Sequence, residues 1–215
     1  MYIEYACYDY SLSDDEIKHN IASAIKLGVS NIALHFIHLS TIKSLVDMDS
    51  INISCPIDYP YGISDLKTRS SSVAIAAKQG VSVIDVVAPA KFIANRKYEK
   101  LREDIQNNID ICKTHNIILR YILEYRVFNH ETLAKTCQIL KSFGVEYVLP
   151  STGHMIDDIN DNLIASKYLT AKSNIHTICN GNIWTPKHIE TLKSSGIYGV
   201  RAHYIANIPL LLQNI

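Results

Sequence analysis

Charged side chains stand inside several of the short apolar runs of this chain. Asp85 lies within the run VIDVV, Arg120 within NIILRYILE and Arg201 within GVRA. Burying a charge without a partner is costly, so Asp85 and Arg120 each need one. Two interpretations are open. The two residues either form a structural ion pair across the fold, or they shape a pocket for a polar substrate and relay protons there.

Other polar groups follow the ends of the apolar runs. Glu124 ends NIILRYILE, where it is either a catalytic carboxylate or a cap for the next loop, and His154 follows a Ser-Thr-Gly sequence. We expect an acid–base site in which Asp85 or Glu124 is the general base and Arg120 stabilises an oxyanion. The predicted catalytic residues are Asp85, Arg120, Glu124 and His154. The predicted substrate-binding residues are Asp9, His35, Asp58, Ser151, Asn180, Arg201 and His203.

The nine histidines raise the question of a metal site. None of them stands in H-E-x-x-H or H-x-H spacing. His35, His154 and His203 could meet Asp85 at one end of the fold, as ligands from separate strands can, but no local spacing supports such a site. No G-x-S-x-G sequence marks a nucleophilic serine. We therefore predict neither a metal nor a cofactor.

A repeat sets the order of the structural elements. Four times the chain reads glycine, then valine or isoleucine, then two residues and a short apolar run. Each glycine follows a segment of helical periodicity, and the four are Gly28, Gly80, Gly144 and Gly196. Glycine just past a helix supplies the left-handed turn that ends it. The short β-branched runs are typical of strands buried on both faces.

Four further apolar runs alternate with these repeats: IEYACY, INISCP, NIILRYILE and NIHTIC. Dividing 215 residues among eight units gives about 27 residues each, which suits a strand, a helix and two loops. Helix starts are predicted at Ser13, which opens a capping box with Glu16, and at Thr185 before Pro186. We predict an α/β fold with a single (β/α)8 TIM barrel as one domain over residues 1–215. An open doubly wound sheet competes, but no G-x-G-x-x-G follows the first strand.

Composition limits the partners of this barrel. Lys plus Arg and Asp plus Glu each number 21, so the formal charge is zero and no basic excess favours nucleic acid. No apolar run approaches the ~18 residues of a membrane span. The five scattered cysteines lack C-x-x-C pairs, as in reduced core thiols, and the N-terminus does not read as a signal peptide. We expect a cytoplasmic protein with a small-molecule ligand at the rim formed by the carboxyl ends of the strands.

Motifs at the expected strand ends resemble those of the deoxyribose-phosphate aldolase family. The matching stretches are YDYSL, DYPYG, VIDVV, ILRYILE, PSTG and the R-x-H-Y that ends the last strand. They occur in the family's order over nearly the whole chain. The resemblance implies a (β/α)8 enzyme that joins acetaldehyde to glyceraldehyde 3-phosphate through a lysine Schiff base, in which an amine beside a second cation forms an imine.

The resemblance also implies which residues occupy the family's active positions. The Schiff-base lysine falls at Leu149, and the second, pKa-lowering lysine falls at Ile178. The proton-relay aspartate is kept as Asp85, a strand lysine is replaced by Arg120, and a lysine after Ser-Thr-Gly is replaced by His154. Asp9 matches the family's early aspartate. A leucine cannot form an imine, so we do not expect the family reaction by the family route.

The phosphate-binding end departs from the family as well. Gly181-Asn182 stands where the family has a Gly-Gly turn, and ANIP at residues 206–209 stands where it has Gly-x-Ser-Ser. Such loops hold phosphate with backbone amides, and proline removes one donor. We expect phosphate binding to be lost or much weakened.

Three functions remain open at the level of sequence. The first is a lyase- or isomerase-type acid–base enzyme for a small polar carbonyl or hydroxy compound. The second is a non-catalytic ligand-binding or regulatory barrel, and the third is a deoxyribose-phosphate aldolase with a relocated lysine such as Lys91. The C-terminal IPLLLQNI could form a homodimer face, although packing as the last barrel helix is the favoured interpretation.

Overall fold

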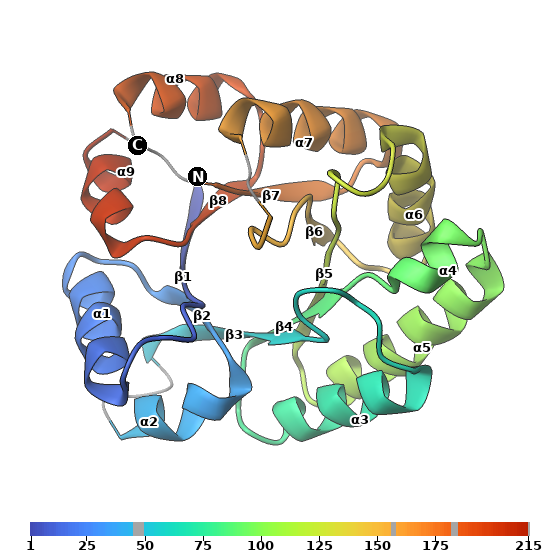
Figure 1. Cartoon of the computed structure of the whole chain (residues 1–215), viewed down its shortest axis with the longest axis horizontal. Coiled ribbons are helices and arrows are strands. Elements are labelled where there is room, and N and C mark those ends of the chain that lie inside the picture. The colour runs from blue at the N-terminus through green and yellow to red at the C-terminus, as the bar shows by residue number, and fades with distance from the viewer. Residues whose placement is uncertain (45–49, 156–157, 182–184, 215) are drawn as a thin grey trace.

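A computed structural model describes residues 1–44, 50–155, 158–181 and 185–214. Within them, the strands form one closed barrel of parallel neighbours in chain order, and β8 pairs with β1 (Figure 1). The strands are β1 (Tyr2–Cys7), β2 (Asn31–Leu34), β3 (Asn52–Ile57), β4 (Val83–Val87), β5 (Ile118–Ile122), β6 (Tyr147–Leu149), β7 (His176–Asn180) and β8 (Gly199–Ala202).

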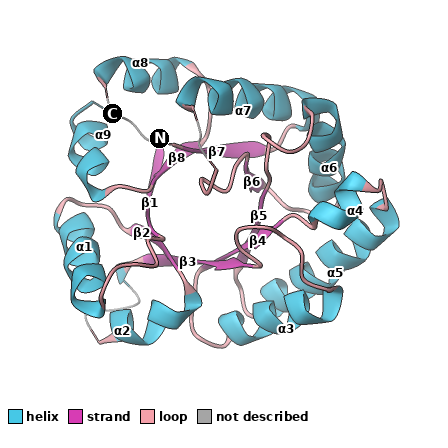
Figure 2. Cartoon of the chain, viewed as in Figure 1, coloured by secondary structure: helices cyan, strands magenta, loops and turns pink. Residues whose placement is uncertain are grey.

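Helices surround this barrel on its outside (Figure 2). They are α1 (Asp14–Lys26), α2 (Leu39–Lys43), α3 (Leu66–Ala77), α4 (Ala90–Ala94), α5 (Tyr98–Thr114), α6 (His130–Ser142), α7 (Ile159–Ser173), α8 (Pro186–Ser194) and α9 (Ile208–Asn214), with short 3-10 turns η1 (Phe36–His38) and η3 (Ile205–Asn207). The alternation confirms the predicted (β/α)8 fold class.

The repeated glycines end helices, as predicted. Gly28 follows α1 with a φ of +93°, and Gly144 follows α6 with a φ of +89°. Apart from the chain neighbours, no described residue has an atom within 4 Å of the place where a Cβ would stand at Gly28 or Gly144. Glycine is therefore favoured here by backbone conformation rather than by lack of space.

Both predicted helix starts are capped as their sequences indicate. The Ser13 hydroxyl accepts from the backbone N–H of Glu16, and the Glu16 carboxylate accepts from the backbone N–H of Ser13 at 2.8 Å. Thr185 accepts from the backbone N–H of His188, with Pro186 in the first turn of α8. These caps satisfy amide donors that have no partner within the helix.

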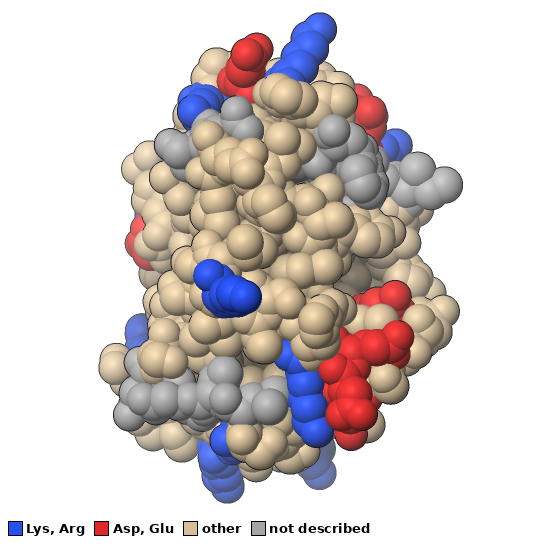
Figure 3. All heavy atoms as spheres, turned by 90° about the vertical axis from the view of Figure 1, so that its left-hand side faces the viewer, with Lys and Arg blue, Asp and Glu red and all other residues tan. Residues whose placement is uncertain are grey.

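The core and the surface agree with the composition. All five cysteines are buried thiols outside disulfide bonds, and burial raises the pKa of Cys55 to about 12. In α9, Ile208 and Leu211 are buried, so this helix packs on the barrel. On the face in Figure 3, uncharged residues cover most of the middle, basic side chains are scattered, and acidic side chains gather mainly at the lower right. None of the helices in the described part of the chain is both long and apolar enough to cross a bilayer.

Candidate functional site

Four charged side chains form a closed network inside the barrel. Arg120 donates to Asp85 from its Nε at 2.6 Å and to Glu4 from its Nη2 at 3.0 Å. Arg201 donates to Glu4 from its Nε at 2.5 Å and to Asp85 from its Nη2. The Ser54 hydroxyl donates to Glu4 at 2.6 Å. Two carboxylates and two guanidinium groups thus balance one another without net charge.

Burial and pairing act in opposite directions on these groups. Burial disfavours the charged form of Glu4, but Arg120 and Arg201 outweigh it and hold the pKa of Glu4 well below its usual range. Asp85 is fully buried and Arg120 is 2% exposed. This is the placement that the structural ion-pair interpretation predicts, extended by Glu4 and Arg201. Removing one member of such a network leaves an uncompensated buried charge.

The two positions that the resemblance assigns to lysines lie in an apolar cluster. Leu149 and Ile178 pack with Val87 and Ile122, and all four are buried. Val87 and Ile122 stand two residues beyond Asp85 and Arg120 on β4 and β5, hence on the same face of each strand. Carbon side chains therefore lie nearer the carboxyl ends of these strands than the charged network does.

Aromatic rings line a broad hollow at the carboxyl ends of the strands, here named the central hollow. Its cavity measures about 700 Å³, and its lining includes Tyr8, Asp9, His35, Tyr59, His154 and His203. The ring of Tyr8 lies 4.9 Å from His35, 5.1 Å from Tyr59 and 5.7 Å from His203, measured between centroids. Burial lowers the pKa of His35, and burial followed by the charge of Arg201 lowers the pKa of His203 to about 4.

The other predicted binding residues do not all reach this hollow. Asp9 is exposed on its rim, where its carboxylate accepts from Ser11. Asp58 turns away and binds Arg69 and Ser64.

Ser151 and Asn180 are buried behind the rim of the central hollow. Asn180 donates from its side chain to the carbonyl oxygen of Ser151, and Asn162 donates to the hydroxyl of Ser151 at 3.0 Å. The side-chain oxygen of Asn180 is buried, and no residue in the described part of the chain donates a hydrogen bond to it. These two residues fix the loop between β6 and α7 against β7.

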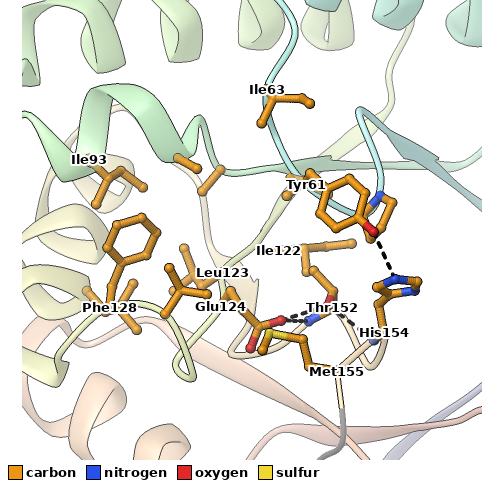
Figure 4. A pocket seen from close by; sticks show the side chains of 16 residues that line it. Tyr61, Ile63, Ile93, Ile122, Leu123, Glu124, Phe128, Thr152, His154 and Met155 are labelled. Atoms are coloured by element: carbon orange, nitrogen blue, oxygen red, sulfur yellow. Dashed lines mark hydrogen bonds between the residues drawn. The ribbon is translucent and has the colours of Figure 1, made fainter.

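Figure 4 shows a second cavity, here named the side pocket. It measures about 310 Å³ and shares Pro60, His154 and Met155 with the central hollow. Its polar lining consists of Tyr61, Glu124, Thr152 and His154. Its apolar lining includes Ile63, Val87, Ile93, Ile122, Leu123 and Phe128.

Hydrogen bonds connect the polar groups of the side pocket. The Glu124 carboxylate accepts from the Thr152 hydroxyl at 2.7 Å and from its backbone N–H at 3.2 Å. The hydroxyl oxygen of Thr152 accepts from the backbone N–H of His154, also at 3.2 Å. The Tyr61 hydroxyl lies 3.2 Å from Nε2 of His154. A carboxylate and an imidazole, both suited to proton transfer, thus line one cavity, and Thr152 connects the carboxylate to the backbone of His154.

Sequence reasoning missed Glu4 and the role of Tyr61. Glu4 is a charge within the first apolar run, just as Asp85 is within another. The charges of Asp85, Arg120 and Arg201 add up to +1. Buried charges need partners, so a second carboxylate within a strand was to be expected. Tyr61 gave no such signal, since only the folded loop after β3 brings its hydroxyl to His154.

The described residues supply neither a metal cluster nor a lysine at the mouth. Across the described ranges, no three His, Cys, Asp or Glu side chains are placed to hold a metal ion. Among the described residues that line the central hollow and the side pocket, none is a lysine. Lys91 is exposed on α4, and Asn182 lies outside the described residues.

Comparisons with known proteins place this architecture among aldolase-type barrels. The chain is 24% identical over 192 residues to the deoxyribose-phosphate aldolase of Mycoplasmopsis pulmonis, covering 89% of this chain and 85% of that one. It is 20% identical over 152 residues to that of Clostridium novyi, covering 71% and 68%. No family profile matches the chain.

Solved structures agree on the fold. An aldolase designated QR15 superposes with a TM-score of 0.88 at 19% identity, over 99% of this chain and 95% of that one. The deoxyribose phosphate aldolase of Aeropyrum pernix, described as tetrameric, superposes with a TM-score of 0.86 at 14% identity, over 99% and 89%. The class is an aldolase-like (β/α)8 barrel. Within that class, the relatives confirm the resemblance to the deoxyribose-phosphate aldolase family.

Proposed function

We propose that this chain is an enzyme that transforms a small carbonyl or hydroxy compound by acid–base steps, without a lysine imine. The observation that carries the proposal is that the Glu124 carboxylate and the His154 side chain line the same cavity, with Thr152 bonded to the carboxylate and to the backbone of His154. The aldolase relatives support lyase- or isomerase-type chemistry at this end of the barrel. The apolar cluster around Leu149 and Ile178 supports the departure from imine chemistry.

Each proton in the proposed reaction has a residue to carry it. Glu124 removes a proton from the carbon beside the substrate carbonyl, and the electrons of that C–H bond pass to the carbonyl oxygen. His154, with Tyr61 beside it, donates a proton to that oxygen and yields an enol or enediol. When the substrate carries a hydroxyl on the carbon that lost its proton, Glu124 returns the proton to the former carbonyl carbon, and His154 takes the proton of that hydroxyl, whose oxygen becomes the new carbonyl. The isomerisation restores both residues and needs no oxidant or further reactant.

Asp85 and Arg120 take no step in this reaction. Both are engaged in the buried network, and neither lines the central hollow or the side pocket. We propose that they hold the barrel strands in register, since they are paired neighbours on β4 and β5. Asp9, His35 and His203 remain the proposed contacts for the polar part of the substrate in the central hollow.

A ligand-binding barrel without catalysis is the second candidate. Two features favour it. The charged side chains inside the barrel are all paired with one another, and apolar side chains occupy the positions where the family has lysines. Turnover separates the two functions. A thermal-shift screen of aldehydes, ketones, sugars and nucleosides finds ligands, because binding to the folded state raises its stability.

The experiment is turnover of a screened ligand by the protein and by Glu124→Gln. We expect Glu124→Gln to lower kcat by about 100-fold or more while leaving the ligand affinity within a few fold, because a general base contributes about that much. Glu190→Gln, an exposed change on α8, is the matched control and should leave kcat unchanged. Equal turnover by Glu124→Gln would remove Glu124 from the mechanism, and no turnover of any ligand would favour the binding function.

We further propose a cytoplasmic enzyme, since five buried thiols outside disulfide bonds fit a reducing compartment. The Aeropyrum pernix aldolase has a tetrameric structure, which makes self-association a reasonable proposal for this chain as well. α9 is a poor candidate for that interface, because Ile208 and Leu211 already pack inside.

A further inference from the structure

The side pocket has walls made mostly of carbon. Val87 and Ala88 at the end of β4, Ile122 and Leu123 at the end of β5, and Phe128 beyond it line the cavity. Water in such a cavity finds few hydrogen-bond partners away from the polar side. An apolar group that enters is therefore favoured by the release of that water.

The wall over β4 is fixed in place by backbone contacts. Gly62 adopts a φ of +62°, and a Cβ there would lie 2.3 Å from the carbonyl oxygen of Ala88. The backbone N–H of Ala90 donates to the carbonyl oxygen of Gly62 at 3.1 Å. Only glycine allows this approach, which holds Tyr61 and Ile63 over the cavity. The pocket is thus built into the fold rather than left by a loose loop.

The charges that line the side pocket and the volume of the pocket limit the class of ligand that it can bind. Among the described residues that line the side pocket, Glu124 is the acidic one, and none is a lysine or arginine that could pair with a phosphate or carboxylate. The cavity of about 310 Å³ is roughly twice the ~150 Å³ of a cavity that holds benzene. One aromatic ring with a short chain fills it.

We propose that the side pocket binds the apolar body of the substrate, so that the substrate class is an unphosphorylated carbonyl or hydroxy compound carrying one aryl or branched alkyl group. This inference rests on the proposed function, because the polar end of the same molecule lies between Glu124 and His154. It goes beyond that function by giving the side pocket the role of selecting an apolar ligand.

The test compares three ketones by calorimetry: 4-phenyl-2-butanone, 2-butanone and dihydroxyacetone phosphate. We expect 4-phenyl-2-butanone to bind at least tenfold more tightly than either of the others, since burying a ring is worth about that factor. Equal or tighter binding of 2-butanone or of the phosphate would overturn the inference.

The variant Ile63→Asp tests whether the phenyl group binds in the side pocket. Ile63 is 73% exposed, so the change is compatible with folding, yet it places a carboxylate on the pocket wall. We expect the preference for the phenyl ketone over 2-butanone to fall at least fivefold. Ile75→Asp, at a 53% exposed position on α3 away from the cavity, is the matched control and should keep the preference. An unchanged preference in Ile63→Asp would place the ring elsewhere and overturn the inference.

The experiments distinguish a failure of the pocket inference from a failure of the proposed function. The calorimetry is repeated with Glu124→Gln, which the proposed function makes inactive but which leaves the carbon walls intact. Phenyl-ketone selectivity without turnover in the parent protein supports the pocket and refutes the proposed chemistry. Turnover of 2-butanone-sized substrates without any aryl preference supports the chemistry and refutes the pocket.

Discussion

Asp85 stands between Arg120 and Arg201, and both oxygens of its carboxylate accept from guanidinium groups. Glu124 meets a different environment, because its donors belong to the backbone and the hydroxyl of Thr152 and the backbone N–H of Arg126. It is also half-buried at the wall of an open cavity. Of the two carboxylates predicted as the general base, Glu124 is therefore accessible to a ligand, whereas Asp85 is not.

Asp85→Asn should destabilise the fold strongly. The change leaves Arg120 and Arg201 facing one carboxylate, and an uncompensated buried charge costs about 3–5 kcal/mol. Urea unfolding measures the loss, with Asp110→Asn on the exposed side of α5 as the control. The double variant Asp85→Leu, Arg120→Met should lose less than Asp85→Asn, because Glu4 and Arg201 stay paired. A loss within about 1 kcal/mol for Asp85→Asn would show that the network is not structural.

His203 should make stability depend on pH between about 6.5 and 4. Its pKa is about 4 in the folded protein, from burial and the charge of Arg201, and ordinary in the unfolded chain. In that window the unfolded chain binds the proton and the folded chain does not, so stability is fully present above pH 6.5 and is lost as the pH falls toward 4. Urea midpoints at about pH 7.5 and 4.5 should differ less in His203→Gln than in the parent. His115→Gln, exposed after α5, should behave as the parent, and an identical pH dependence in His203→Gln would refute the shift.

Elements with a local signal could be predicted from the sequence. The glycine after each helical segment, the capping box at Ser13 and the β-branched runs act within a few residues, so the pattern alone indicates them. Glu4 pairs with residues more than 100 positions away, and the side pocket joins segments at the ends of four different strands. Such features depend on the closed barrel and on loop geometry, which short-range patterns do not contain.

Gly144→Ala tests the helix-ending role at one element. The position has a φ of +89° and free space around it, so we expect a loss of about 1 kcal/mol from backbone conformation alone. Gly144→Asn should lose less, because asparagine tolerates the left-handed region. Gly199→Ala should lose more than either, since its Cβ would lie 2.6 Å from Tyr2. Equal unfolding free energies for Gly144→Ala and Gly199→Ala would contradict this distinction.

At the scale of the whole molecule, a (β/α)8 barrel encloses a paired charge network and an apolar cluster. Closing the parallel sheet brings every strand's carboxyl end to one rim, which is why residues of β4 and β5 and of the segments after the other six strands reach the two cavities. The same closure buries Leu149 and Ile178 against Val87 and Ile122. One barrel fold supports many chemistries, so the function follows from these side chains rather than from the fold.

Borohydride trapping tests most directly whether this barrel works without an imine. The protein is incubated with acetaldehyde, reduced with sodium borohydride and analysed by peptide mass spectrometry. We predict no lysine that is alkylated to a greater extent in the folded protein than in the urea-unfolded chain, because Leu149 and Ile178 leave no amine in the apolar cluster. A single lysine that is modified saturably in the folded protein only, at Lys91 or elsewhere, would contradict this prediction and restore covalent aldolase chemistry.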